Sequence, residues 1–213
     1  TEQGSELMKA RRQLDFSDNV FGRTGLGLLF ASVGNSIPSV FWCLYHILSD
    51  PIVHEAILAE VDGAIANRSN EGDKEMFILS LEELGGMEIL RSAFSEALRL
   101  YHGAFTVREV TDNFVFDTKK KGQYKYLIEK GTRIMAFQAT RHYSAALFDN
   151  PEKFQYDRFV PKGGKRVADI RPFGGGTRLC PGRKFIRYEV QAFVALLLMR
   201  FDMKMLRAKP NPI

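Results

Sequence analysis

The chain has 213 residues, of which 45% are hydrophobic and 26% are charged, and this is enough apolar material for a substantial globular core. Its formal net charge of +5 is spread along the sequence, with one local run of three lysines at residues 119–121. No basic stretch is interleaved with aromatic residues, so nucleic-acid binding is excluded from the expected functions. The lysine run is interpreted as a solvated turn, or alternatively as a docking face for an acidic partner.

The two cysteines, Cys43 and Cys180, stand in different surroundings. Cys43 lies in an apolar helical run, which predicts a buried thiol; no disulfide between the two is implied, so a reducing compartment is expected. The sequence contains no run of 18 uninterrupted apolar residues and no signal peptide, so neither a membrane span nor secretion is predicted. The first four residues indicate a chain cut from a larger protein.

Apolar residues recur at three- and four-residue steps across residues 16–48, which predicts one long helix with a buried face. Pro38 lacks an N–H and clashes with the carbonyl of Gly34, so the hydrogen-bond ladder is expected to open near Asn35. An opened turn with small polar side chains can hold water or a small ligand; a simple kink in a core helix is the alternative. The residues of the predicted buried face are Leu26, Leu29, Phe30, Val33, Ile37, Phe41, Leu44 and Leu48.

Three further helices are predicted before residue 102. Asp50 and Pro51 are the residue types of an N-cap and a first helical position, so the second helix is expected over residues 52–66. A polar loop is predicted at 67–74 and a short helix at 79–84. The apolar stripe of residues 87–101 predicts the last of these helices, on which Glu96 and Arg99 share one face. As an isolated surface ion pair, these two residues would contribute little to stability.

After residue 105 the pattern changes to alternation, which predicts short strands at 106–108, 114–116 and 132–135, with a charged hairpin loop over 117–131. A short helix is expected at 139–146, then a turn-rich segment from 148 to 173. Irregular segments of this length inside a domain are usually functional. A helix at 185–199 and a terminal strand at 201–205 complete the chain. The predicted class is therefore mainly α with a minor β region.

A glycine-rich loop over residues 173–182 carries Cys180 and leads directly into the last predicted helix. A helix N-terminus stabilises a thiolate, which is the form that binds metal, and glycines let a flat cofactor approach the backbone. A lone cysteine is more often a small buried hydrophobe. Cys180 differs from such a cysteine because it belongs to a set of residues at fixed spacing. The set is Phe173, Gly176, Arg178, Cys180 and Gly182.

This spacing resembles, at each fixed position, the haem-binding signature of the cytochrome P450 family. The resemblance implies that Cys180 is the proximal iron ligand of haem b and that Arg178 contacts a haem propionate. Arg108 occupies a position that contacts a propionate in members of the family. A thiolate ligand favours O–O cleavage at haem iron.

A second resemblance concerns the charged residues Glu96, Arg99 and Arg158. They are similar to the family's buried triad, in which a Glu-x-x-Arg pair on a helix beneath the haem is joined by an arginine from the turn-rich segment. The resemblance implies that the triad locks this segment in place and so preorganises the cysteine loop. Because an unpaired buried ion costs several kcal/mol, loss of one member is expected to impair folding or haem retention.

The third resemblance lies in residues 31–38 with Phe41 and Trp42, which are similar to the distal helix of one branch of the family. That branch contains cholesterol 7-alpha-hydroxylase, related sterol hydroxylases and prostacyclin synthase. In the usual family pattern, an acid precedes a threonine on this helix. The pair organises water and delivers protons on the oxygen side, which is the face of the haem where O2 binds. Here Asn35 takes the acid position and Ser36 the alcohol position, so both are candidate catalytic residues. Asparagine cannot ionise, although its amide and the serine hydroxyl can hold a water.

The resemblance covers residues 1–213 as the C-terminal portion of a single cytochrome P450 domain. It implies that the absent N-terminal half supplies substrate-recognition loops and, in eukaryotes, the membrane anchor. The leading expectation is a haem-thiolate monooxygenase that inserts one atom of O2 into an apolar, steroid- or lipid-like substrate. An NADPH-dependent reductase would be its redox partner, at the cytosolic face of the endoplasmic reticulum membrane in a eukaryote. The alternatives are an isomerase or dehydratase of an oxygenated lipid, and a truncated, non-catalytic haem-binding or interaction module.

Overall fold

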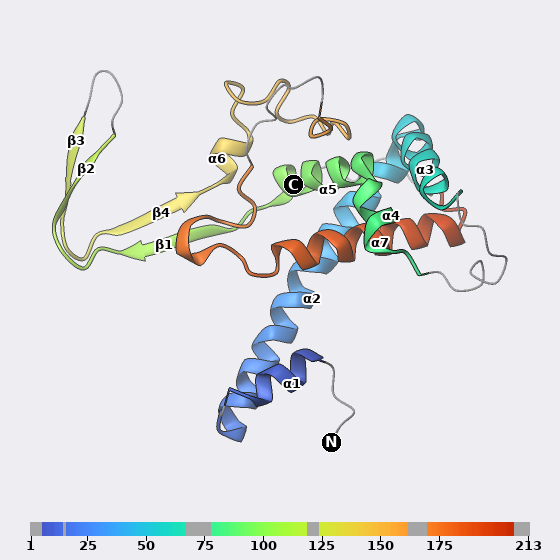
Figure 1. Cartoon of the computed structure of the whole chain (residues 1–213). Coiled ribbons are helices and arrows are strands. Elements are labelled where there is room, and N and C mark those ends of the chain that lie inside the picture. Colours follow the sequence, from blue (N-terminus) through green and yellow to red (C-terminus); the bar gives the residue numbers. More distant parts are fainter. Residues whose placement is uncertain (1–5, 15, 67–77, 119–123, 162–169, 207–213) are drawn as a thin grey trace.

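The computed structural model describes residues 6–14, 16–66, 78–118, 124–161 and 170–206 (Figure 1). Helices make up most of the described part, and four short strands form two separate antiparallel pairs, so the mainly α class with a minor β region is confirmed. The described helices are α1 (Glu6–Arg12), α2 (Asp18–Ser49), α3 (Pro51–Ile65), α4 (Leu81–Gly86), α5 (Glu88–Tyr101), α6 (Ala139–His142) and α7 (Arg183–Arg200), and the described part also contains the 3-10 turn η2 (Gly176–Arg178).

The core lies where the C-terminal part of α2 meets α3, α5 and α7. Cys43 and Ile47 of α2 are fully buried there, as are Ile57 of α3 and Val194 of α7. Burial raises the pKa of the Cys43 thiol to about 12, so this residue is an inert core thiol, as predicted. The buried apolar side chains of these four helices form one continuous cluster.

The N-terminal half of α2 projects away from the packed helices (Figure 1). The side chains of Leu26, Phe30 and Ile37 are 69%, 76% and 62% exposed, so the prediction of a buried face over this stretch is wrong for the described chain. Apolar periodicity specifies which face of a helix is apolar, but it does not supply the surface that covers that face. The buried residues of α2 are Cys43 and Ile47, both near its C-terminal end.

By length and composition α2 is also the one described helix that could cross a membrane, although its apolar residues do not form an uninterrupted run of 18. Core helices of folded proteins meet the same criteria, so one such helix is weak evidence of a span. The C-terminal part of α2 packs against three other helices, as a core helix does.

The predicted opening at Pro38 is not formed, because α2 runs without a break from Asp18 to Ser49. Polar side chains near the proline bond to the backbone of their own helix instead. The Asn35 amide donates to the carbonyl of Ala31 at 2.9 Å, and the Ser39 hydroxyl donates to the carbonyl of Asn35 at 2.7 Å. These local bonds give the polar side chains and the backbone carbonyls hydrogen-bond partners while the helix stays closed.

Side chains cap the starts of the next three helices. Asp50 accepts from the N–H of Ile52 at 2.9 Å and Pro51 begins α3, as predicted. Ser80 and Glu83 form a capping box at α4, one to two residues later than the expected start. The N-terminus of α5 is capped across space by Glu60 of α3, which accepts from the N–H groups of Ile89 and Leu90 at 2.6 and 2.8 Å.

Strands β1 (Phe105–Glu109) and β4 (Arg133–Phe137) pair in register, with Phe105 opposite Phe137, and β2 (Phe114–Asp117) pairs with β3 (Lys125–Ile128). Strand β3 lies inside the stretch predicted as a charged loop. Both pairs extend away from the helices in Figure 1, and most of their side chains are exposed.

Two predictions near the C-terminal half are corrected. Helix α6 ends at His142, earlier than expected, because the chain enters consecutive turns there. Residues 201–205 do not form the predicted strand; the N–H of Phe201 instead bonds to the carbonyl of Leu197 and ends α7. Apolar alternation alone does not make a strand when no described strand offers it a hydrogen-bonding edge. The loop predicted at 67–74 falls outside the described residues.

Candidate functional site

The cysteine loop closes on itself just before α7. The N–H of Cys180 donates to the carbonyl of Phe173 at 3.0 Å, and η2 lies between these two residues. Gly174 and Gly176 have φ angles of +76° and +65°, in the left-handed region that glycine adopts without a steric penalty. Two of the loop's glycines are therefore required by its backbone conformation.

Cys180 is a half-buried free thiol three residues before the first residue of α7. Arg183, at the start of that helix, donates from Nη1 to the carbonyl of Cys180 at 3.1 Å. This bond ties the backbone at Cys180 to the start of α7. Leu179 and Phe185, on either side in sequence, are exposed apolar side chains.

These residues fit a haem group. The donor is a single accessible thiol, which is the axial ligand type of haem-thiolate proteins, and the adjoining apolar side chains suit a flat apolar macrocycle. The other two expected haem contacts, Arg108 on β1 and Arg178 on η2, are exposed. The Arg108 guanidinium donates to the neighbouring carbonyl of Val107 at 2.8 Å, and a role of either arginine toward a propionate stays a prediction.

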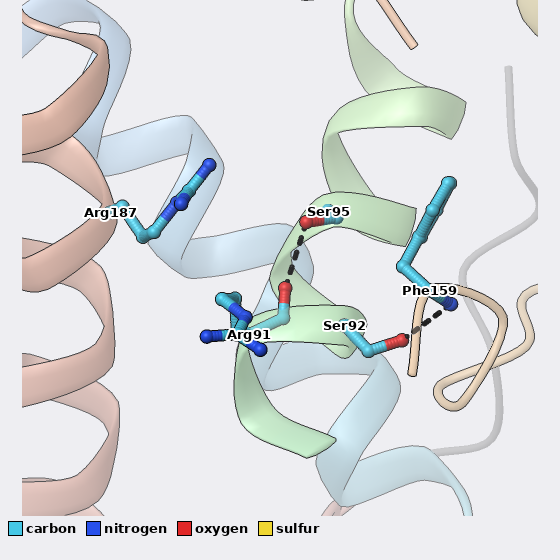
Figure 2. Close-up of a pocket in the computed structure, with 5 residues that line it drawn as sticks. All are labelled: Arg91, Ser92, Ser95, Phe159 and Arg187. Atoms are coloured by element: carbon cyan, nitrogen blue, oxygen red, sulfur yellow. Dashed lines mark hydrogen bonds between the residues drawn. The ribbon is translucent and has the colours of Figure 1, made fainter. Parts of the chain in front are cut away.

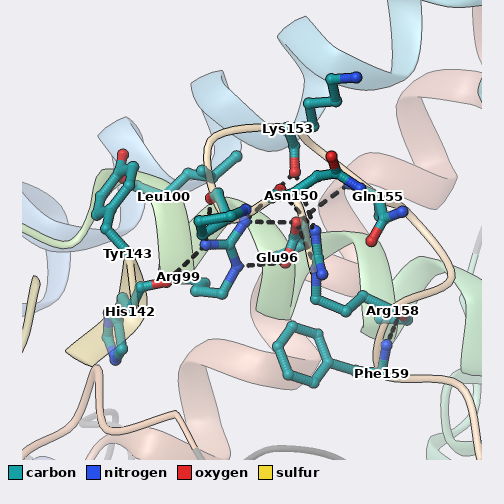
Figure 3. Close-up of polar contacts among 12 residues, drawn as sticks. Glu96, Arg99, Leu100, His142, Tyr143, Asn150, Lys153, Gln155, Arg158 and Phe159 are labelled. Carbon is teal, nitrogen blue, oxygen red and sulfur yellow. Dashed lines mark hydrogen bonds and ion pairs between the residues drawn. The ribbon is translucent and has the colours of Figure 1, made fainter. Parts of the chain in front are cut away.

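The structure brings the three predicted charged residues together (Figure 3). Glu96 and Arg99 lie one turn apart on α5 and are both completely buried. Arg99 makes a two-bond contact with the carboxylate, from Nε to Oε2 at 2.7 Å and from Nη2 to Oε1 at 2.8 Å. Arg158, 9% exposed, reaches the same carboxylate from Nε at 2.9 Å. One carboxylate is thus shared between two guanidinium groups, in the strong bidentate geometry for one of them.

Backbone carbonyls of residues 142–153 accept the remaining guanidinium hydrogens. Arg99 donates to the carbonyls of His142 at 2.7 Å and Pro151 at 2.6 Å, and Arg158 donates to that of Asp149 at 2.8 Å. The buried ring of Phe148 lies 5.1 Å from the Arg99 guanidinium carbon and so adds a cation–π contact. The network therefore holds residues 149–158 of the turn-rich segment against α5. The sequence did not indicate these carbonyl acceptors or Phe148.

His142 connects this network to the cysteine loop. Its carbonyl accepts from Arg99, and its ring Nε2 accepts from the backbone N–H of Arg171 at 3.1 Å, two residues before Phe173. Burial, and then the nearby His102, lower the pKa of His142 to about 4, which keeps the ring neutral and able to accept. Its Nδ1 is a buried atom without a hydrogen-bond partner among the described residues. His142 was not found from the sequence, because the contact depends on chain folding.

The two candidate catalytic residues of α2, Asn35 and Ser36, have different surroundings. Asn35 is exposed and bonds within its own helix. The hydroxyl of Ser36 lies 2.8 Å from Oε2 of Glu189, on α7, the helix that follows Cys180. The structure therefore connects the candidate oxygen-side alcohol to the helix of the cysteine loop. Glu189 is a functional candidate that sequence reasoning missed.

A small pocket lies between α5, α7 and the turn-rich segment, and Figure 2 shows the side chains around it. Its volume is about 120 Å³, whereas sites for drug-sized ligands hold roughly 300–1,000 Å³. The pocket is too small and too polar for a steroid-like molecule. Two arginines border it, of which Arg91 pairs with Glu88 at 3.0 Å. The lining residues are Arg91, Ser92, Ser95, Phe159 and Arg187.

Comparison with known proteins identifies the family. The cytochrome P450 family model matches residues 5–213. The chain belongs to the cytochrome P450 family. Two curated members are the 25-hydroxycholesterol 7-alpha-hydroxylase of Rattus norvegicus, 32% identical over 97% of this chain and 53% of its own length, and a cytochrome P450 monooxygenase of Penicillium oxalicum, 37% identical over 92% and 40%. The cholesterol 7-alpha-monooxygenase of Cricetulus griseus is 29% identical over 97% of the chain and 44% of its own length.

The solved structure of another cytochrome P450 shares the fold, with a TM-score of 0.73 at 21% identity, over 93% of this chain and 42% of that one. The chain spans about half the length of the curated P450 relatives it matches. Cytochromes P450 are haem proteins, so the family and the thiol of the cysteine loop indicate the same cofactor.

Proposed function

We propose that this chain is the C-terminal half of a haem-thiolate monooxygenase that inserts one atom of O2 into an apolar substrate. The observation that carries the proposal is the position of Cys180, a half-buried thiol at the N-terminus of α7, in a loop tied through His142 to the buried network of Glu96, Arg99 and Arg158. A ligand loop anchored to a buried charge network is preorganised for a metal–thiolate bond. The relatives named above as hydroxylases and monooxygenases support this reaction class.

In the proposed mechanism, haem b held by a thiolate supplies the O–O cleavage chemistry when it is bound. Cys180 would provide the thiolate, and Arg183 holds the carbonyl of Cys180 at the start of α7. Gly174 and Gly176, which carry no side chain, would let the loop backbone approach the macrocycle. Arg108 and Arg178, both exposed guanidinium groups, would bind the haem carboxylates with charge-assisted hydrogen bonds.

A sterol or a lipid of similar shape is the proposed substrate class. Two of the relatives carry cholesterol or hydroxycholesterol in their names, and this chain is 32% and 29% identical to them. The exposed apolar face of α2, with Phe30, Val33 and Ile37, offers the kind of surface that such a molecule needs. We propose that the missing half of the domain covers the rest of this face and completes the substrate cavity.

The proposed electron donor is an NADPH-dependent reductase that docks on the side of the pocket between α5 and α7. Arg91 and Arg187 border this pocket, and Arg183 and Lys184 precede Arg187 on α7. A concentration of positive charge on one surface attracts an acidic partner and speeds its association. In a eukaryote this would take place at the cytosolic face of the endoplasmic reticulum membrane, which the missing part of the protein would contact.

A second reaction is favoured by one observation. The residue in the acid position of α2 is Asn35, whose amide cannot carry a proton to the oxygen side. An isomerase or dehydratase of an oxygenated lipid needs no such proton delivery and no reductase. A third candidate, a non-catalytic haem-binding or interaction module, is supported by the exposed apolar face of α2.

The proposal is tested by the carbon-monoxide difference spectrum of the reduced protein and by product formation from a sterol. We expect a strongly red-shifted Soret band that disappears in Cys180→Ala, and product that depends on both O2 and reductant. An unshifted band at full haem occupancy would contradict thiolate ligation. Product formed from a lipid peroxide without reductant would support the isomerase instead. Haem binding that requires a longer chain would favour the interaction module for these 213 residues.

A further inference from the structure

The pocket between α5, α7 and the turn-rich segment is lined mainly by side chains that donate hydrogen bonds (Figure 2). Arg91, Ser92 and Ser95 come from α5, Arg187 comes from α7, and Phe159 belongs to the turn-rich segment. None of these five described lining residues is acidic. A pocket with donors on two sides and no carboxylate in its lining favours an anion over a cation.

The two arginines differ in how far their charge is already compensated. Arg91 donates from Nη2 to Glu88 at 3.0 Å and from Nη1 to the carbonyl of Gly85 at 3.4 Å, so some of its five N–H hydrogens remain available. The exposed Arg187 makes no hydrogen bond or ion pair with any described residue. Figure 2 shows its side chain extending from α7 toward α5. The pocket therefore keeps one uncompensated positive charge.

Ser92 adds a buried donor that the described part of the chain leaves unused. The residue is 1% exposed, and its Oγ accepts from the backbone N–H of Phe159 at 2.8 Å. Its hydroxyl hydrogen has no acceptor among the described residues, and a buried donor without an acceptor costs free energy. Ser95 differs, because its hydroxyl already donates to the carbonyl of Arg91 at 2.8 Å. A ligand that accepts from Ser92 would remove this cost.

The size of the pocket limits the anion. Its volume of about 120 Å³ equals the share of about four water molecules in the liquid, at roughly 30 Å³ each. One tetrahedral oxyanion falls in this size range, whereas a sterol or a whole nucleotide does not. Donors reach the pocket from Arg187 on one helix and from Arg91 and Ser92 on the other. Several oxygens of a tetrahedral ion can accept from these different directions at once.

We infer that this pocket binds one phosphate group, either inorganic phosphate or the head of a phosphate monoester. Arg187 and Arg91 donate to its oxygens from α7 and α5, and the hydroxyl of Ser92 donates from the buried side. None of these residues belongs to the cysteine loop, so binding does not require haem. Bound phosphate would neutralise the positive surface on which we propose that the reductase docks. Only this last consequence rests on the proposed function.

Calorimetric titration of the purified protein with inorganic phosphate, at constant ionic strength, tests the inference. We expect saturable binding, weakened about tenfold or more in Arg187→Gln because a charged donor is lost. Ser92→Ala should also weaken binding, whereas Ser95→Ala should not, since the Ser95 hydrogen is already used within α5. Arg23→Gln, the same change on an exposed position of α2, is the matched control. Equal affinity in wild type and Arg187→Gln would overturn the inference, and this exposed position decides the question even if Ser92→Ala fails to fold.

Vesicles of phosphatidylcholine with and without phosphatidic acid distinguish the two sources of the phosphate. Binding of free phosphate identifies a soluble ligand, and binding that depends on both phosphatidic acid and Arg187 identifies a lipid head group. Absence of both would overturn the inference. In a reductase assay at fixed ionic strength, phosphate should raise the KM for the reductase less in Arg187→Gln than in wild type. If phosphate binds but leaves this KM unchanged, the docking surface is wrong, whereas the phosphate site stands.

Discussion

Arg171 donates its backbone N–H to Nε2 of His142 at 3.1 Å, and this bond joins the start of the cysteine loop to the buried network around Glu96. His142 offers its carbonyl to Arg99 and its ring to Arg171, so it is anchored on both sides. The cysteine loop is therefore held by α5 at its beginning and by α7 at its end. This double anchorage explains how an irregular segment can present one thiol in a defined place.

The buried carboxylate of Glu96 is expected to be essential to folding. Glu96→Gln leaves two buried guanidinium groups without a charge partner, which costs about 3–5 kcal/mol in the free energy of unfolding. The matched control is Glu88→Gln on the same helix, whose pair with Arg91 is 50% and 31% exposed and should contribute less than about 1 kcal/mol. Urea unfolding of both variants measures the difference, and equal losses would contradict the structural role assigned to the network.

The stability of the fold should depend on pH through His142. Its pKa is about 4 in the folded protein, against an ordinary value of 6.5, because burial disfavours the charged ring. The unfolded chain binds more protons between these values, so stability is fully present above pH 6.5 and is lost as the pH falls toward 4. We expect a loss on the order of 2 kcal/mol across this window.

The control for this dependence is His142→Gln, which keeps an acceptor for the N–H of Arg171 but cannot titrate. Urea unfolding over the same pH range should show a much smaller slope in this variant. A residual slope is expected from His102, because burial lowers its pKa as well. An unchanged slope would show that another group is responsible.

The backbone of the cysteine loop should reject a side chain at Gly176. Its φ of +65° is unfavourable for other residues, and nothing lies within 4 Å of an added Cβ, so the cost of Gly176→Ala is conformational and amounts to about 1 kcal/mol. Gly85→Ala is the control, because it lies in α4, also has open space, and should be neutral or stabilising. Haem titration of both variants, followed by the Soret band, should show weakened haem binding only for Gly176→Ala.

The two thiols should differ sharply in reactivity. Cys180 is half-buried near a helix N-terminus, whereas Cys43 is completely buried with a pKa of about 12. A thiol reagent should therefore modify one cysteine in the native protein and two in denaturant, and Cys180→Ala should abolish the native reaction. Bound haem should protect Cys180. Native labelling that persists in Cys180→Ala would mean that the core around Cys43 opens readily.

The positive face between α5 and α7 is expected to bind the electron donor. Arg187→Glu should raise the KM for an acidic reductase several-fold at low ionic strength, and added salt should reduce the difference. Arg23→Glu, the same charge reversal on an exposed position of α2, is the control. Equal effects of both changes would indicate only a response to net charge.

Local patterns were sufficient for the elements whose signals lie within a few residues. The N-cap of α3 at Asp50, the amphipathic helix α5 and the paired strands around Val107 and Phe116 follow from capping chemistry and side-chain period. Strand β3 is not evident from the sequence, because charged and polar residues on both sides obscure its short alternation. The opposite holds at the end of the chain. The alternation of residues 201–205 predicts a strand, but these residues form none, because no described strand pairs with them.

The haem-ligand motif around Cys180 is readable from the amino-acid order, because the glycines, the arginine and the thiol of that loop are neighbours along the chain. The surroundings of Cys180 depend on how the chain folds. The carbonyl of His142 lies 43 residues from Arg99, and Glu189 lies 153 residues from Ser36. Such contacts form when the core brings distant segments together, and no local pattern records them. The exposed face of α2 follows the same rule: its apolar period is local, but burial depends on a covering surface.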